Sequence, residues 1–91
     1  MSTDIAKERD LIQQGDEADV LLKNDVFNKT INNLVENVFQ QFVNSQAEDE
    51  KSRERIYNHY RALVDIVHTL QQRVAVRDEI LAKDDSDNNG E

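Results

Sequence analysis

Neither proline nor glycine occurs between residues 16 and 89, and this gap constrains the fold more than any other feature of the sequence. The two glycines, Gly15 and Gly90, stand at its borders, and the chain has no proline at all. A β-sheet needs frequent turns, and turns draw heavily on these two residue types. A chain of 91 residues makes one small domain at most. The sequence therefore predicts an all-α fold built from long helices.

A heptad pattern of apolar residues lies in the second half of the chain. Its members recur at alternating steps of four and three residues, and they are Ile56, Tyr60, Leu63, Val67, Leu70 and Val74. This spacing places one apolar stripe along a helix, which another helix must cover. Arg77 stands where the next apolar residue is due, so we expect the coil to weaken after Val74. The predicted helix runs from about residue 49 to residue 82.

A broader apolar stripe lies earlier, between residues 16 and 45. The residues that fall on one line of it are Val20, Phe27, Ile31, Leu34 and Val38. Val35, Phe39 and Phe42 widen the stripe to about 140° of the helix surface. Because one facing helix cannot cover so wide a stripe, Phe39 and Phe42 need cover from the N-terminal segment or from another chain. The residues predicted to contact other chains are Phe39, Val43, Val64 and Ile66.

Two alternatives remain open where Asn24 and Asp25 interrupt this apolar pattern. Asparagine is a favoured N-cap residue, so a new helix can begin at Asp25. The other alternative is one continuous helix from residue 16 with a polar position inside it. Val20 and Phe27 keep the same phase across the interruption, which slightly favours continuity.

A turn is predicted where residues 44–51 carry Ala47 as their only apolar side chain. Ser45 or Asp49 can cap the helix that follows, and the acidic residues near Asp49 suit its first turn. The predicted domain is therefore an antiparallel hairpin over residues 16–82. Each of its two arms is roughly 30 residues and about 45 Å long.

The two ends of the chain lie outside this hairpin. Residues 1–15 predict a short N-terminal helix that Gly15 ends, and its few apolar residues indicate a helix that is either frayed or docked on a partner. Residues 83–91 contain no apolar side chain, so we expect a disordered acidic tail.

Charge and composition exclude several classes of protein. The formal net charge is −8, with 19 acidic and 11 basic side chains, which disfavours duplex DNA and anionic membranes as partners. The chain has no cysteine, so it has neither disulfides nor thiolate metal sites. No stretch approaches the roughly 20 apolar residues that span a bilayer, and the N-terminus does not resemble a signal peptide. We expect a soluble protein made in the cytoplasm.

No group of residues in the sequence predicts catalysis or ligand binding. His59 and His68 are nine residues apart and lie on opposite sides of one helix, so they cannot share a metal within one chain. The sequence contains no nucleophile elbow, phosphate-binding glycine loop or zinc motif. We therefore expect a protein that is not an enzyme, with no catalytic residue, cofactor, metal or small-molecule substrate.

One local cluster of basic residues is a candidate patch for nucleic acid or an acidic partner. Its members are Lys51, Arg53, Arg55 and Arg61. Ion pairs along the helix, with Glu54 and the acidic residues before Lys51, are the stronger interpretation. Tyr60 belongs to the heptad stripe and is not free to stack on bases. We therefore do not expect nucleic acid as the main partner.

Two stretches together resemble a known group of proteins. Residues 15–27 read G-D-E-A-D-V-L-L-K-N-D-V-F, and residues 52–57 read S-R-E-R-I-Y, followed by Tyr60, Leu63 and Leu70. They resemble small acidic helical-hairpin proteins encoded among the head and packaging genes of tailed bacteriophages. The resemblance covers about residues 15–81 and carries no catalytic residues. It implies a phage origin and a part in the virion or its assembly.

The expected function follows from the stripes and this resemblance. We expect a homo-oligomer that packs helix on helix, made in the host cytoplasm and incorporated in the virion, with other phage structural proteins as partners. A charge at Phe42 or Leu70 is expected to dissociate or unfold it. The alternative is a small phage-encoded binding module that inhibits or adapts a host protein, and a third class is a DNA-packaging accessory.

Overall fold

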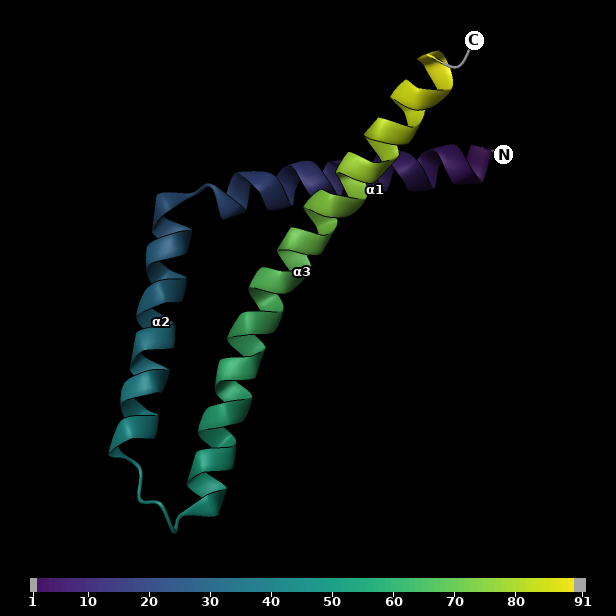
Figure 1. The fold of residues 1–91 in the computed structure, drawn as a ribbon. Helices are drawn as coiled ribbons and strands as arrows, with labels where there is room; N and C mark the ends of the chain where they lie inside the picture. Colours follow the sequence, from purple (N-terminus) through teal and green to yellow (C-terminus); the bar gives the residue numbers. More distant parts are fainter. Residues whose placement is uncertain (1, 90–91) are drawn as a thin grey trace. The chain divides into compact units, whose positions relative to one another are not determined.

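The computed structural model describes residues 2–89, with side chains described for residues 4–84. The described residues form three helices and no strand, so the predicted all-α fold is confirmed. Figure 1 shows the helices, which are α1 (Ser2–Leu22), α2 (Asp25–Asn44) and α3 (Glu50–Asn89). The predicted arms of about 30 residues each are wrong in length, because α2 has 20 residues and α3 has 40.

The chain divides into two compact units, and α3 contributes to both. One unit, here called the α2 unit, comprises Asn24–His68, which is α2 and the first part of α3. The other, here called the α1 unit, comprises Met1–Lys23 and Thr69–Glu91, which brings α1 together with the later part of α3. The residues of the heptad stripe are therefore divided between the two units. Leu63 and Val67 lie in the α2 unit, whereas Leu70 and Val74 lie in the α1 unit.

Helix α2 begins at Asp25 because Asn24 caps it. Asn24 has extended backbone angles (φ −79°, ψ 122°), and its side-chain oxygen accepts a hydrogen bond of 2.9 Å from the backbone N–H of Phe27. This bond satisfies one of the backbone donors that the first turn of a helix leaves free. The alternative of one continuous helix across Asn24 is therefore wrong.

A five-residue connection, residues 45–49, joins α2 to α3. Ser45 ends α2, since both its backbone N–H and its hydroxyl donate to the Phe42 carbonyl oxygen, at 3.1 and 2.6 Å. Asp49 starts α3, because its carboxylate accepts a hydrogen bond of 3.2 Å from the backbone N–H of Ser52. Asp49, not Ser45, is thus the N-cap that the sequence left undecided.

The core of the α2 unit is small. Val38 and Leu63 are the buried side chains among the described residues of this unit, at 3% and 5% exposure. The half-buried apolar residues around them are Phe27, Ile31, Leu34, Val35, Ile56, Val64 and Val67. α2 and the first part of α3 lie side by side along this stripe (Figure 1). Most of the apolar surface of the unit therefore stays partly in water.

Helix α1 continues through Gly15, so the prediction that Gly15 ends the first helix is wrong. Gly15 is buried and lies against α3. A Cβ atom on Gly15 would lie 2.9 Å from the Arg73 carbonyl oxygen and still closer to the Cβ of Arg77. Ala18, one turn later, is 2% exposed. These two small residues let the backbones of α1 and α3 approach where larger side chains would hold them apart.

The predicted disordered tail is also wrong for residues 83–89, where α3 continues to Asn89. Residues 50–89 contain no proline or glycine, so no strong helix-breaking residue ends α3 earlier. Gly90 and Glu91, which belong to the same predicted tail, lie outside the described residues.

Candidate interaction surface

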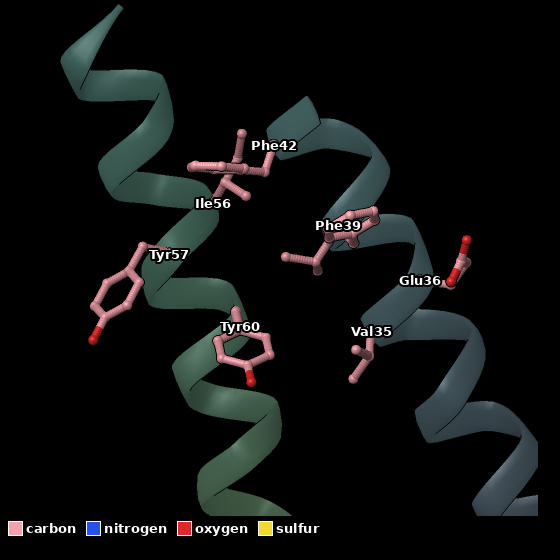
Figure 2. A pocket seen from close by; sticks show the side chains of 8 residues that line it. Val35, Glu36, Phe39, Phe42, Ile56, Tyr57 and Tyr60 are labelled. Atoms are coloured by element: carbon pink, nitrogen blue, oxygen red, sulfur yellow. The ribbon is translucent and has the colours of Figure 1, made fainter. Parts of the chain in front are cut away.

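An apolar groove lies between α2 and the first part of α3 (Figure 2). Its volume is about 500 Å³. The residues that line it are Val35, Glu36, Val38, Phe39, Phe42, Ile56, Tyr57 and Tyr60. Glu36 is the one charged residue in this lining, and Figure 2 shows its side chain pointing away from α3. The floor and walls of the groove are thus made of apolar and aromatic side chains.

Aromatic side chains in the groove remain largely in water. Phe39 is 57% exposed and Tyr57 58%, while Phe42 and Tyr60 are 43% and 42% exposed. Scattered apolar residues on a surface are ordinary, but four aromatic rings gathered around one groove form a contiguous patch. Patches of this kind mark sites of contact with another molecule.

Arg53 does not line the groove but contacts Phe42, which does. Its guanidinium carbon lies 4.6 Å from the centroid of the Phe42 ring, and its Nε donates a hydrogen bond of 3.1 Å to the Ser45 hydroxyl oxygen. The half-buried cation therefore orients Phe42 by a cation–π contact and ties α3 to the end of α2. Sequence reasoning missed this contact, because Phe42 and Arg53 are brought together only by the turn between them.

The basic cluster does not form one surface. Arg53 is engaged at the groove, whereas Arg55 lines a separate hollow of about 480 Å³ together with Ser52. Arg61 pairs with Asp65 along the helix at 3.6 Å. Lys51 is exposed. The predicted patch for nucleic acid or an acidic partner is therefore divided among different sides of α3.

The four residues predicted to contact other chains lie in different environments. Phe39 and Val43 are each 57% exposed on α2, and Ile66 is 47% exposed on α3. Val64 is half-buried. Because two helical residues correspond to about 200° of rotation, Ile66 and Val64 point to different sides of α3. Phe39 lines the groove, whereas Val43, Val64 and Ile66 do not line it.

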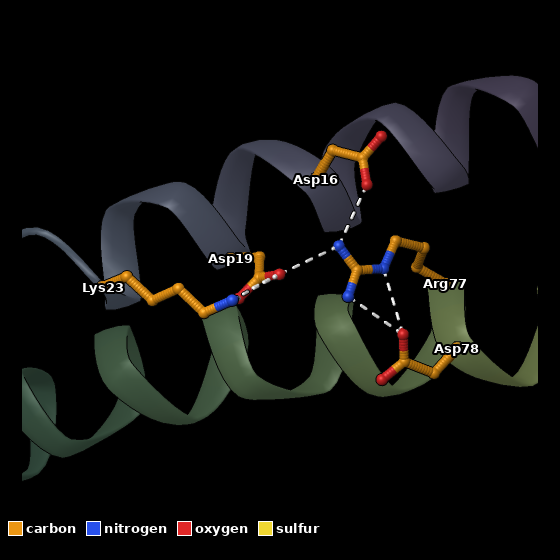
Figure 3. Close-up of polar contacts among 5 residues, drawn as sticks. All are labelled: Asp16, Asp19, Lys23, Arg77 and Asp78. Carbon is orange, nitrogen blue, oxygen red and sulfur yellow. Dashed lines mark hydrogen bonds and ion pairs between the residues drawn. The ribbon is translucent and has the colours of Figure 1, made fainter.

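A cluster of charged residues joins α1 to the later part of α3 (Figure 3). Arg77 Nη1 lies 2.9 Å from Asp16 Oδ1 and 3.2 Å from Asp19 Oδ2, and Arg77 Nη2 lies 2.9 Å from Asp78 Oδ1. Lys23 pairs with Asp19 at 3.2 Å. Arg77 occupies the next heptad position after Val74 but is half-buried and fully engaged. The sequence predicted that the contact between helices would weaken after Val74. Arg77 instead continues this contact.

Two groups of this cluster, Asp19 and Arg77, are stabilised in their charged forms by their hydrogen bonds and ion pairs. The hydrogen bond from Lys23 is the main cause that lowers the pKa of Asp19 below its ordinary value of 3.8, and the hydrogen bond from Arg77 adds to it, while burial acts in the opposite direction. Hydrogen bonds to Asp78, Asp16 and Asp19 raise the pKa of Arg77. A carboxylate with a lowered pKa, such as that of Asp19, is a poor proton donor and acceptor near neutral pH. The cluster therefore has the character of a structural contact between helices.

The described residues contain no group of three or more histidine, cysteine, aspartate or glutamate side chains placed to hold a metal ion. His59 and His68 are both exposed. Within the same residues, no helix combines the length and the apolar character that crossing a membrane requires.

Comparisons of the chain with protein-family models, with curated proteins and with solved structures find no match.

Proposed function

We propose that this protein is a non-enzymatic assembly protein that associates with further copies of itself through the groove of the α2 unit. The observation that carries the proposal is the gathering of exposed aromatic rings, Phe39 and Tyr57 foremost, around an apolar groove on a small helical unit. Burial of such a patch is favourable at about 25 cal/mol per Å² of apolar surface. The same helix packing that forms the unit can continue into a neighbouring chain.

The small core of the unit supports this proposal. Val38 and Leu63 are its buried side chains, and a domain of this size with so little buried apolar surface commonly depends on association for stability.

The charge distribution indicates which surface two copies can share. Each chain carries a net charge of −8, so most approaches of one copy to another are repulsive. Asp25, Lys29 and Glu36 are the only charged residues of α2, whereas charged residues make up 33% of the whole chain. Depletion of charge is typical of the central part of protein interfaces. α2 is therefore the part of the surface where like-charged copies can meet.

The proposed function includes a hairpin arrangement of the helices and a bacteriophage origin. α2 and the first part of α3 would act as a helical hairpin, and two or more hairpins would form a bundle. The resemblance to small acidic phage proteins supports a role in the virion or its assembly, after synthesis in the host cytoplasm. Mass spectrometry of purified phage particles tests this role, since it asks directly whether the chain is a component.

Light scattering of the purified protein tests the self-association. We expect wild-type protein to have a molar mass of a discrete oligomer, above the 10.5 kDa of one chain. Phe39→Glu should reduce the mass to that of one chain without loss of helical circular dichroism, because Phe39 is more than half exposed. Val20→Glu on α1, at a residue that is 70% exposed and outside the groove, is the matched control and should remain oligomeric.

A monomeric wild-type protein would overturn the proposal. The alternative function, a binding module for a host protein, would then be favoured, because the apolar groove would stay exposed in the isolated chain.

A further inference from the structure

We infer that the groove binds the same groove of a second copy about a two-fold axis parallel to the helices, so that α2 packs antiparallel on the partner's α3. This inference rests on the proposed self-association and specifies its geometry. In it, Phe39 faces the partner's Tyr60. The symmetry makes every contact occur twice, as a closed dimer requires.

A matched pattern of side chains on the two helices carries this inference. On α2, Val35, Phe39 and Val43 follow each other at steps of four residues, with the aromatic ring in the middle. On α3, Ile56, Tyr60 and Val64 repeat the same order of branched, aromatic and branched side chains at the same steps. A four-residue step turns about 40° around a helix, so each set stays near one side.

The two sets are also placed at the same level of the unit. Phe39 and Tyr60 line the groove from opposite helices, and Figure 2 shows Tyr60 pointing across toward α2. A rotation about an axis parallel to the helices keeps that level and exchanges the helices. Val43 then faces the partner's Ile56, while Val35 faces the partner's Val64. The branched residues would thus pack on either side of a central aromatic pair.

The charges beside the groove favour this arrangement over one with α2 on the partner's α2. Glu36 flanks the groove on α2, and Arg61 follows Tyr60 on the outer side of α3. Packing α2 on the partner's α3 brings Glu36 near the partner's Arg61, which is opposite in charge. The present partner of Arg61 is Asp65, at 3.6 Å in an exposed pair, so its side chain can turn to a second carboxylate. When α2 packs on the partner's α2, the only basic residue of that helix is Lys29, which lies seven residues from Glu36 in the sequence, about 10 Å along the helix.

Disulfide trapping with single-cysteine variants tests the inference, because the natural chain has no cysteine. Val43→Cys and Ile56→Cys are prepared separately, mixed and exposed to mild oxidation. We expect a covalent dimer that contains one chain of each variant, and we expect little covalent dimer from either variant alone. Phe39→Cys alone should also remain unlinked. Val20→Cys, at an exposed residue outside the groove, measures random collision.

The outcomes separate this inference from the proposed function. Covalent dimers of Phe39→Cys alone would indicate α2 packed on the partner's α2, and would overturn the inferred orientation while the self-association stands. An oligomeric protein with no trapping above the Val20→Cys control would overturn the groove contact. A monomeric wild-type protein would overturn both the geometry and the self-association.

Discussion

Arg77 and Asp19 are 58 residues apart in the sequence, and Arg77 Nη1 donates a hydrogen bond of 3.2 Å to Asp19 Oδ2. The arginine side chain is only 15% exposed, and the aspartate side chain is 26% exposed. The pair joins α1 to the later part of α3, beside the close approach at Gly15. Arg77, a charged residue at a heptad position that is usually apolar, therefore makes a specific contact between the two helices.

The pH dependence of stability should report this pair. The pKa of Asp19 is lowered in the folded protein, so its stabilising effect is complete above its ordinary value of 3.8 and is lost as pH falls through the lower folded value. Between about pH 6 and pH 2 we expect the urea midpoint of wild-type protein to fall more steeply than that of Asp19→Asn. Parallel curves for the two proteins would refute the contribution of Asp19.

Gly15→Ala should destabilise the protein, although alanine is the better helix former by about 1 kcal/mol. The new methyl group would meet the Arg73 carbonyl oxygen and the Cβ of Arg77, neither of which can move without a shift of the α3 backbone. Overpacking costs about 1–3 kcal/mol, so we expect a net loss of about 1 kcal/mol in urea unfolding. Gln13→Ala, at an exposed position of α1, is the control and should change little. A more stable Gly15→Ala protein would contradict the close approach.

Asn24→Ala should cost about 1 kcal/mol of unfolding free energy, because the variant lacks the oxygen that accepts from the Phe27 N–H. Asn33→Ala is the matched control, at an exposed position inside α2. It removes the same side chain where no cap exists, and alanine should be neutral or slightly stabilising there. Equal effects of the two substitutions would mean that the cap at Asn24 does not stabilise α2.

The sequence predicted those features that depend on neighbouring residues. The helical class followed from the absence of chain breakers, and Asn24 was recognised as a possible cap because the capping bond spans only three residues. Gly15 was misjudged because its role depends on α3, more than fifty residues later. Ala18, three residues beyond Gly15, is the local sign of a close helix contact that could have indicated it.

The sequence could not assign the partners of the heptad stripe. An apolar stripe indicates that another helix must cover it, but it does not indicate which helix. Here Leu63 and Leu70 belong to different units. The contact of Arg53 with the Phe42 ring depends on the turn between them and has no fixed spacing. The sequence pattern predicted that Phe39 and Phe42 would need cover from another segment or chain. It did not predict that Tyr57 would also line the groove and be exposed.

Charge reversal across the proposed dimer should weaken it and then restore it. Glu36→Arg alone places two arginines together at each rim, and Arg61→Glu alone places two glutamates together. We expect each variant to dimerise several-fold more weakly than wild-type protein, since a rim pair contributes about 0.2–1 kcal/mol and its reversal is repulsive. An equal mixture of the two variants restores opposite charges, so its dimerisation should recover. A mixture no stronger than either variant alone would show that Glu36 and the partner's Arg61 do not meet.

Sedimentation equilibrium of wild-type protein over a wide concentration range tests self-association most directly. The inferred dimer predicts a mass that rises to about 21 kDa, twice the 10.5 kDa of one chain. A mass of 10.5 kDa at every concentration would contradict self-association through the groove.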